Sequence, residues 1–272
     1  MHQLRTIGAL VLILVLCCTG CTYNPATGRQ QFLSMSTSQE IAVGEEATPK
    51  LTQEYGGEVT AIRPYVNEVG KRLAQHVEPQ YKDLPWEFIV LDTEQINAFA
   101  LPGGKVFICR GLVSELADES QLAGVLGHEI GHVTGQHIDE RISHQWGADV
   151  VLEVFKHTTE SQAAVQIASL FNTGYQLRFS RQQESESDAL GLKYMVAAGY
   201  DPRGLVGVLE VLRDASEGSR PIELFSTHPN PETRLEQIAE LLNSEYKYAV
   251  DNPSYQRYKQ QFTQRALQPL GQ

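Results

Sequence analysis

The sequence of 272 residues has few cysteines and few basic residues. Three of its four cysteines, Cys17, Cys18 and Cys21, lie at the start of the chain, which excludes a disulfide framework for the rest. Lysine and arginine number 22 against 33 acidic residues, and the formal net charge is −11. Because phosphate binding requires clustered Lys and Arg, we expect no nucleic-acid partner.

Internal repeats and long low-complexity segments are also absent. The N-terminus differs from the rest: a basic start precedes an apolar run over residues 7–18 and the small residues Thr19 and Gly20. The run is shorter than the ~20 residues that cross a bilayer, so it predicts a signal peptide over residues 1–20 rather than a membrane anchor. Gly20-Cys21 resembles the end of a bacterial lipobox, which implies a lipid on Cys21.

Most of the chain has helical patterns. Residues 21–36 contain turn pairs and predict an extended lead. Thr37 to Glu40 predicts a capping box at the start of the first helix. Residues 148–172 are weakly patterned and predicted helical, and residues 215–230 are predicted to form a loop. Spaced apolar residues and start and stop signals predict further helices over residues 37–55, 61–77, 119–144, 180–198, 202–214 and 231–243.

Three strands are predicted over residues 86–91, 97–101 and 105–109. The turn signal Pro102-Gly103-Gly104 joins the last two, and Cys109 is expected to be a small core residue. Residues 37–243 therefore predict one α+β domain, mainly helical with a small sheet of three or four strands. A polar tail over residues 244–272 follows, which either packs on the domain or is loose.

The segment His128-Glu129-Ile130-Gly131-His132 lies within the predicted helix 119–144. Residues four apart on a helix differ by 400°, so the two imidazoles project from one face. They can share one Zn²⁺ at about 2.0–2.1 Å, and Glu129 beside it can take a proton from water. Two core histidines with an unrelated glutamate are the alternative, which the apolar flanks of the motif disfavour.

A catalytic zinc ion needs a third protein ligand. The metzincin pattern would place a histidine where Ile138 stands, and His137 is one position early, so we expect His137 at the surface or a helix terminus. Downstream, Glu184 and Asp188 share a helix face and predict a gluzincin site: Glu184 binds the metal and Asp188 orients an imidazole. Glu186 points elsewhere, and a solvated acidic face is the alternative.

Four segments resemble the HtpX-like, BepA- and LoiP-type metallopeptidases, which are relatives of the prenyl-protein (CAAX) proteases. The segments are residues 23–29 (Tyr-Asn-Pro-Ala-Thr-Gly-Arg), 97–104, 128–132 and 180–188. The resemblance spans most of residues 23–235 and implies a zincin-like gluzincin domain. Ser187 replaces the alanine of that family, a small-for-small change that we expect to leave zinc binding intact.

The same resemblance implies roles for two other segments. His228, in a His-Pro segment, could stabilise the oxyanion or occupy the open zinc position as a latch; an ordinary loop histidine is the alternative. The strand at residues 97–101 would align an extended peptide, with Asn97 and Ala98 near the scissile bond. Core packing alone would also explain the apolar residues of that strand.

The expected function is hydrolysis of peptide bonds in unfolded or misassembled envelope proteins, with one Zn²⁺ on His128, His132 and Glu184 and with Glu129 as general base. Expected partners are extended polypeptides, the membrane through lipid on Cys21 and, by resemblance, outer-membrane assembly machinery. The expected location is the periplasmic side of a bacterial outer membrane.

A lipid-anchored chaperone with latched protease activity is the alternative, which the lack of tetratricopeptide repeats disfavours. A structural zinc module would instead have four closed ligands.

Overall fold

The computed structural model describes residues 21–147, 162, 165, 178–216, 227–228 and 231–272. The predicted signal peptide lies outside these residues, as do nearly all of the segment 148–172 and most of the predicted loop 215–230. Within the described part of the chain, no helix is both long and apolar enough to cross a membrane.

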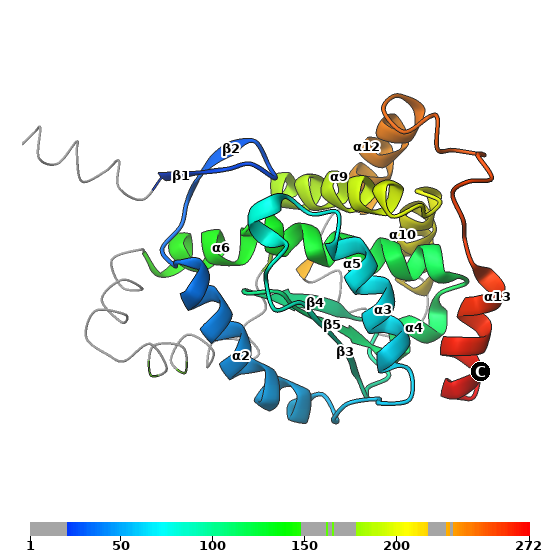
Figure 1. Cartoon of the computed structure of the whole chain (residues 1–272), viewed down its shortest axis with the longest axis horizontal. Helices are drawn as coiled ribbons and strands as arrows, with labels where there is room; N and C mark the ends of the chain where they lie inside the picture. The colour runs from blue at the N-terminus through cyan, green and yellow to red at the C-terminus, as the bar shows by residue number, and fades with distance from the viewer. Residues whose placement is uncertain (1–20, 148–161, 163–164, 166–177, 217–226, 229–230) are drawn as a thin grey trace, which may run out of the picture.

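The fold is built around one central helix, α5 (Glu119–Thr134), in which every residue is buried. It packs against α3 (Arg63–Ala74), α9 (Arg181–Ala197) and α10 (Arg203–Ser216). Figure 1 shows α9 on one side of α5 and the main sheet on the other. The other helices of this region are α2 (Thr37–Glu54), the short α4 (Arg110–Glu115) and α12 (Pro231–Asn243).

The main sheet has three strands in the order β3-β5-β4. The strand β3 (Glu87–Leu91) is parallel to β5 (Lys105–Cys109), and β4 (Ala98–Leu101) is antiparallel to β5. Gly103 and Gly104 form the β4–β5 turn with φ of 76° and 92°, values that favour glycine. The edge strand β4 packs against α5, and Cys109 is buried as predicted. The α+β class with a small sheet is thus confirmed.

The single helix predicted over residues 119–144 is wrong, because two helices occupy this range. The helix α5 ends at Thr134, and α6 (His137–Trp146) begins after a break. Gln136 adopts φ of 51° in the left-handed region, which a continuous right-handed helix does not allow. The break redirects α6 and brings His137 back toward the end of α5.

The predicted capping box is displaced by one residue. Ser36, not Thr37, caps α2, and its hydroxyl accepts a hydrogen bond from the amide of Gln39. The pair Ser-x-x-Gln satisfies the same rule as Thr-x-x-Glu, so the pattern alone could not separate them. Glu40, which was expected to complete the capping box, takes no part in it, and its side chain is buried.

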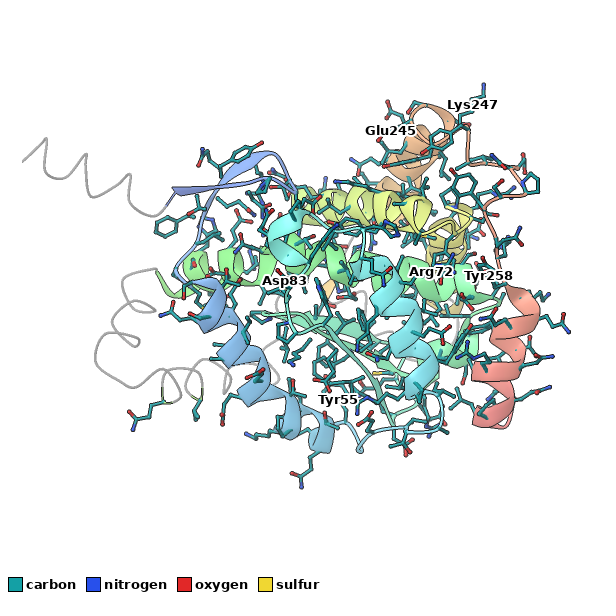
Figure 2. All side chains as sticks on the ribbon, viewed as in Figure 1. Tyr55, Arg72, Asp83, Glu245, Lys247 and Tyr258 are labelled. Carbon is teal, nitrogen blue, oxygen red and sulfur yellow. The ribbon has the colours of Figure 1, made fainter. Side chains whose placement is uncertain are left out.

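The N-terminal lead forms a two-stranded hairpin, and the C-terminal tail packs on the domain. In the hairpin, β1 (Cys21–Asn24) and β2 (Arg29–Phe32) pair antiparallel. In the tail, α13 (Lys259–Phe262) continues through a π-helical turn over Thr263–Leu267. Phe262 is buried, and the Arg72 guanidinium of α3 lies 5.5 Å from the ring centre of Tyr258. Figure 2 labels both residues at the place where α3 meets the tail.

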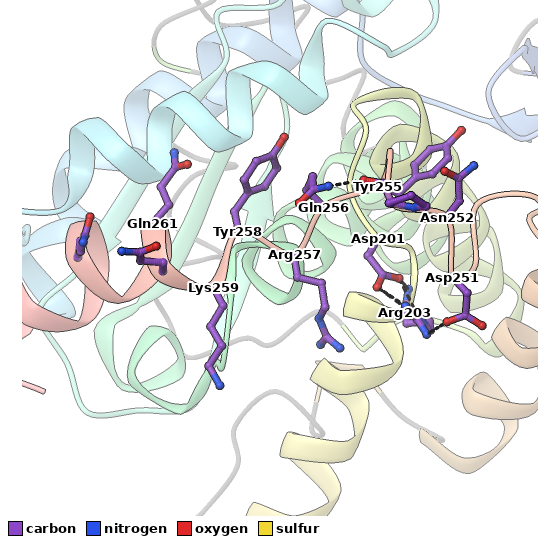
Figure 3. Close-up of a pocket in the computed structure, with 13 residues that line it drawn as sticks. Asp201, Arg203, Asp251, Asn252, Tyr255, Gln256, Arg257, Tyr258, Lys259 and Gln261 are labelled. Carbon is purple, nitrogen blue, oxygen red and sulfur yellow. Dashed lines mark hydrogen bonds and ion pairs between the residues drawn. The ribbon is translucent and has the colours of Figure 1, made fainter.

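The tail also reaches the N-terminal end of α5. Asp118 caps α5, and Arg257 Nε donates to its Oδ2 at 2.8 Å. A shallow pocket of about 940 Å³ lies between the tail and the start of α10, where Arg203 bridges Asp201 and Asp251 (Figure 3). No residue of the histidine motif lines this pocket, so we relate it to tail packing rather than to the chemistry below.

Candidate metal centre

The close crossing of α5 and α9 brings the histidine motif next to Glu184. A Cβ added at Gly131 would lie 2.8 Å from the carbonyl oxygen of Ser187 and 2.9 Å from its Cα. Glycine is therefore required at this point of α5 for the two backbones to approach so closely. Ser180 caps α9 in a capping box with Gln183, which places Glu184 in the first turn of α9.

Four buried side chains converge at this crossing: His128, His132, Glu184 and His228. One potential ligand atom from each lies within 4.8 Å of the others. The two Nε2 atoms of His128 and His132 are 3.0 Å apart, and His132 Nε2 is 3.4 Å from Glu184 Oε1. Ligand atoms bound about 2.1 Å from a tetrahedral ion lie about 3.4 Å apart, so the donor set fits a single such ion.

Glu129 lies beside this cluster and is almost fully buried. Its Oε1 is 3.7 Å from His228 Nε2, and its Oε2 has no hydrogen-bond partner among the described residues. Burial raises the pKa of the Glu129 carboxyl, and the neighbouring His228 and His128 partly oppose this rise. An unpartnered buried carboxylate oxygen beside a metal-ligand cluster is available to accept a proton.

His128 is held by a direct contact with Asp188. Its Nδ1 lies 2.8 Å from Asp188 Oδ1, so Nε2 is directed into the cluster. Arg234 donates to both oxygens of Asp188 at 2.6 and 2.7 Å, and its Nη1 lies 2.9 Å from Glu184 Oε2. Burial opposes ionisation of Asp188, but Arg234 and His128 outweigh it and lower the pKa of this carboxyl.

His132 is held by His137, which is buried rather than exposed as one expectation had it. The two Nδ1 atoms are 3.0 Å apart, and His137 Nε2 lies 3.0 Å from Glu186 Oε2. His137 does begin α6, so the helix-terminal alternative is correct. Glu186 does lie outside the ligand cluster, but it is linked to the cluster through His137.

Sequence reasoning missed two residues that complete the site. The ring of Phe179 stacks on His132, with centroids 3.8 Å apart, and Phe179 N donates to Thr227 O beside His228. Phe179 directly precedes the capping box of α9, which is the only local signal that could have marked it. Arg234 lies in α12, and nothing local in the sequence indicates that it reaches α9.

The predicted substrate strand lies at the expected edge of the sheet. Ala98 is the first residue of β4, whereas Asn97 precedes the strand, and both side chains are buried. Asn97 O accepts a hydrogen bond from Cys109 N. No described strand pairs with the other edge of β4, and β4 packs against α5.

A His-Glu-x-x-His helix joined to a glutamate from a second helix defines a gluzincin-type metallopeptidase site. Comparison with known families agrees: residues 61–242 match peptidase family M48, and the chain belongs to this family.

Curated relatives include proteins of bacteria and of eukaryotes. The chain is 33% identical over 227 residues to the mitochondrial metalloendopeptidase OMA1 of Schizosaccharomyces pombe, covering 81% of this chain and 66% of that protein. It is 31% identical over 226 residues to the beta-barrel assembly-enhancing protease of Escherichia coli K12, covering 78% of this chain and 45% of that protein. The chain thus spans less than two thirds of these relatives.

Proposed function

We propose that this chain is a zinc-dependent metalloendopeptidase. The observation that carries the proposal is the cluster of four buried potential ligands beside the unpartnered carboxylate oxygen of Glu129. His128, His132 and Glu184 would hold the metal. Two imidazoles with one carboxylate form a donor set that suits zinc better than the harder cations Mg²⁺ and Ca²⁺.

A zinc ion held by these residues would supply Lewis acidity, which would polarise the peptide carbonyl and lower the pKa of a water molecule toward ~7. Glu129 accepts the proton of the attacking water and then donates it to the amine that leaves. Asp188 keeps the His128 ring oriented, and Arg234 forms ion pairs with the two buried carboxylates of α9.

The decisive experiment compares the wild type with Glu129→Gln on unfolded casein, with bound zinc measured in both. Glu129→Gln keeps the size of the side chain but cannot accept a proton. We expect it to retain zinc and to lose cleavage by about 10²–10⁴-fold. Equal cleavage by both proteins would refute the catalytic assignment.

A latched form of the enzyme is the second candidate, and the position of His228 favours it. His228 Nδ1 lies 2.9 Å from Glu184 Oε1 and 3.2 Å from His128 Nε2, inside the ligand cluster. Four protein ligands would close a site that catalysis requires to have one open position. A chaperone or assembly factor with secondary protease activity would use such a closed site.

His228→Ala separates the two roles of this histidine. Faster cleavage of casein with zinc retained would support the latch. Slower cleavage with zinc retained would support stabilisation of the oxyanion instead. Unchanged cleavage would contradict both roles and leave His228 as a packing residue.

The substrates that we propose are extended or unfolded polypeptides, including misassembled envelope proteins. Among the described residues one edge of β4 is unpaired and the strand packs against α5, so an added peptide strand would pass close to the cluster, with Asn97 and Ala98 near the scissile bond. Casein should therefore be cleaved much faster than a compact folded protein of similar size. Equal rates for the two substrates would contradict this mode of binding.

We further propose that the chain is lipid-anchored through Cys21 on the periplasmic side of a bacterial outer membrane, near the assembly machinery. The N-terminal pattern supports this, as does the name of the Escherichia coli relative. The fungal relatives are named as mitochondrial enzymes, so the relatives alone do not indicate in which compartment this chain is located. Cys21→Ala should move the protein from the membrane to the soluble fraction; continued membrane association would contradict the anchor.

A further inference from the structure

The β1–β2 hairpin, which precedes residues 61–242 of the family match, contacts the end of the metal-binding helix. Asn24 Nδ2 donates to Thr134 O at 2.9 Å, and Gln31 Nε2 donates to Gly135 O at 2.7 Å. The last carbonyls of a helix have no partner within the helix, so these two amides satisfy groups that would otherwise be buried unpaired. The hairpin thus fixes the end of α5, two or three residues beyond His132.

Arg29 of the hairpin joins three elements. Its Nη1 and Nη2 donate to the two oxygens of Glu140 in α6 at 2.6 and 2.7 Å. Its Nε donates to Glu186 Oε1 in α9 at 2.7 Å. Only the planar guanidinium can supply this bidentate pair together with a third bond, so lysine would not replace it.

With His132 Nε2 as a metal ligand, the contacts from the cluster to Arg29 imply one position for each proton. His132 Nε2 faces the cluster, so its Nδ1 carries the hydrogen and donates to His137 Nδ1 at 3.0 Å. His137 therefore carries its own hydrogen on Nε2, which donates to Glu186 Oε2 at 3.0 Å. The other oxygen of Glu186 accepts from Arg29, and the series of bonds ends in the hairpin.

We propose that Arg29, Glu186 and His137 act as positioning residues that hold His132 in place as a metal ligand. Ligating histidines usually donate their second N–H directly to a carboxylate or carbonyl, and removal of that partner weakens metal binding. Here an imidazole lies between His132 and the carboxylate, and Arg29 of the β1–β2 hairpin holds that carboxylate. The inference rests on the proposed function, because it requires that His132 bind metal.

Zinc affinity of the full chain tests the inference directly, by competition with a chromophoric chelator. We expect His137→Ala to weaken zinc binding about 10–100-fold and Arg29→Ala about 10-fold. Arg63→Ala is the matched control, because Arg63 also joins two carboxylates, Glu58 and Glu87, but contacts no residue of the cluster. Its zinc affinity should stay within about two-fold of the wild type.

Two further measurements separate positioning from loss of the fold. Far-ultraviolet circular dichroism of the metal-free variants checks folding, and Glu186→Gln, which preserves side-chain size, replaces His137→Ala if that variant does not fold. The visible spectrum of the Co²⁺-substituted protein reports ligand geometry and should change in His137→Ala but not in Arg63→Ala. His137→Gln keeps an acceptor for His132 Nδ1 and should recover part of the affinity.

His132→Ala supplies the reference that distinguishes the two possible failures. If the wild type binds zinc no tighter than His132→Ala, the proposed metal site itself is wrong. If the wild type binds far tighter than His132→Ala while folded His137→Ala, Glu186→Gln and Arg29→Ala all match the wild type, the site is right and the positioning role is overturned.

Discussion

His128 and His132 lie one turn apart on α5 and face the same cluster, but their outward nitrogens are held in different ways. His128 donates to Asp188 directly, and Arg234 neutralises that carboxylate inside the core. His132 reaches a carboxylate only through His137, and Arg29 on that side keeps 22% of its side chain exposed against 6% for Arg234. We call Asp188 and Arg234 the His128 side, and His137, Glu186 and Arg29 the His132 side. We infer that the His128 side mainly determines the stability of the fold, whereas the His132 side mainly affects metal binding.

The largest expected effect comes from the arginine on the His128 side. Arg234→Ala leaves Asp188 and Glu184 buried without a counter-charge, which costs about 3–5 kcal/mol of unfolding free energy. Arg29→Ala should cost only about 1–3 kcal/mol, because water can reach Glu186. Urea unfolding of the metal-free proteins measures both losses, and equal losses would contradict the proposed division between the two sides.

A substitution at the helix crossing should affect both histidines together. Gly131→Ala places a Cβ 2.8 Å from the Ser187 carbonyl oxygen, which should cost about 1–3 kcal/mol and move Glu184 away from the pair. The matched control is Gly124→Ala, whose Cβ would meet Leu205 of α10 at 3.1 Å, away from the ligands. Zinc affinity should fall only in Gly131→Ala; an equal fall in both would contradict the role of the α5–α9 crossing.

The last prediction is a pH dependence of stability that comes from Glu140 on the His132 side. Burial opposes ionisation of Glu140, but hydrogen bonds from Arg29 and Gln183 outweigh it and lower its pKa from 4.5 to about 2. A carboxyl with a lowered pKa stabilises the folded state fully above pH 4.5 and loses this contribution as the pH falls toward 2. The difference in unfolding free energy between wild type and Glu140→Gln should therefore shrink over this range. A constant difference would contradict the ion pair.

Much of the metal centre could be predicted from the sequence because its spacings are local. The two imidazoles of the motif share a helix face whatever surrounds the helix, and the same holds for Glu184 and Asp188. The structure brings both pairs together, as expected. Their assignment as ligands, base and orienting group remains a proposal that the experiments above test.

The surroundings of the cluster could not be predicted in this way. His137 falls one position early for the metzincin spacing, and in a continuous helix it would lie about 140° around the axis from His132. The left-handed residue Gln136 breaks the helix and turns His137 back onto His132. Arg234 and Arg29 reach α9 from far along the chain, and no local pattern reports such contacts.

The sequence by itself determined the His-Glu-x-x-His face, the acidic face of α9, the three strands of the main sheet and most helix bounds, because these follow from a periodicity of a few residues. Only the tertiary structure decided which groups hold the two histidines, and it showed that the N-terminal hairpin and the C-terminal tail contact opposite ends of α5. The physical reason is that ion pairs and buried hydrogen bonds depend on distances across the folded chain, which local periodicity does not encode.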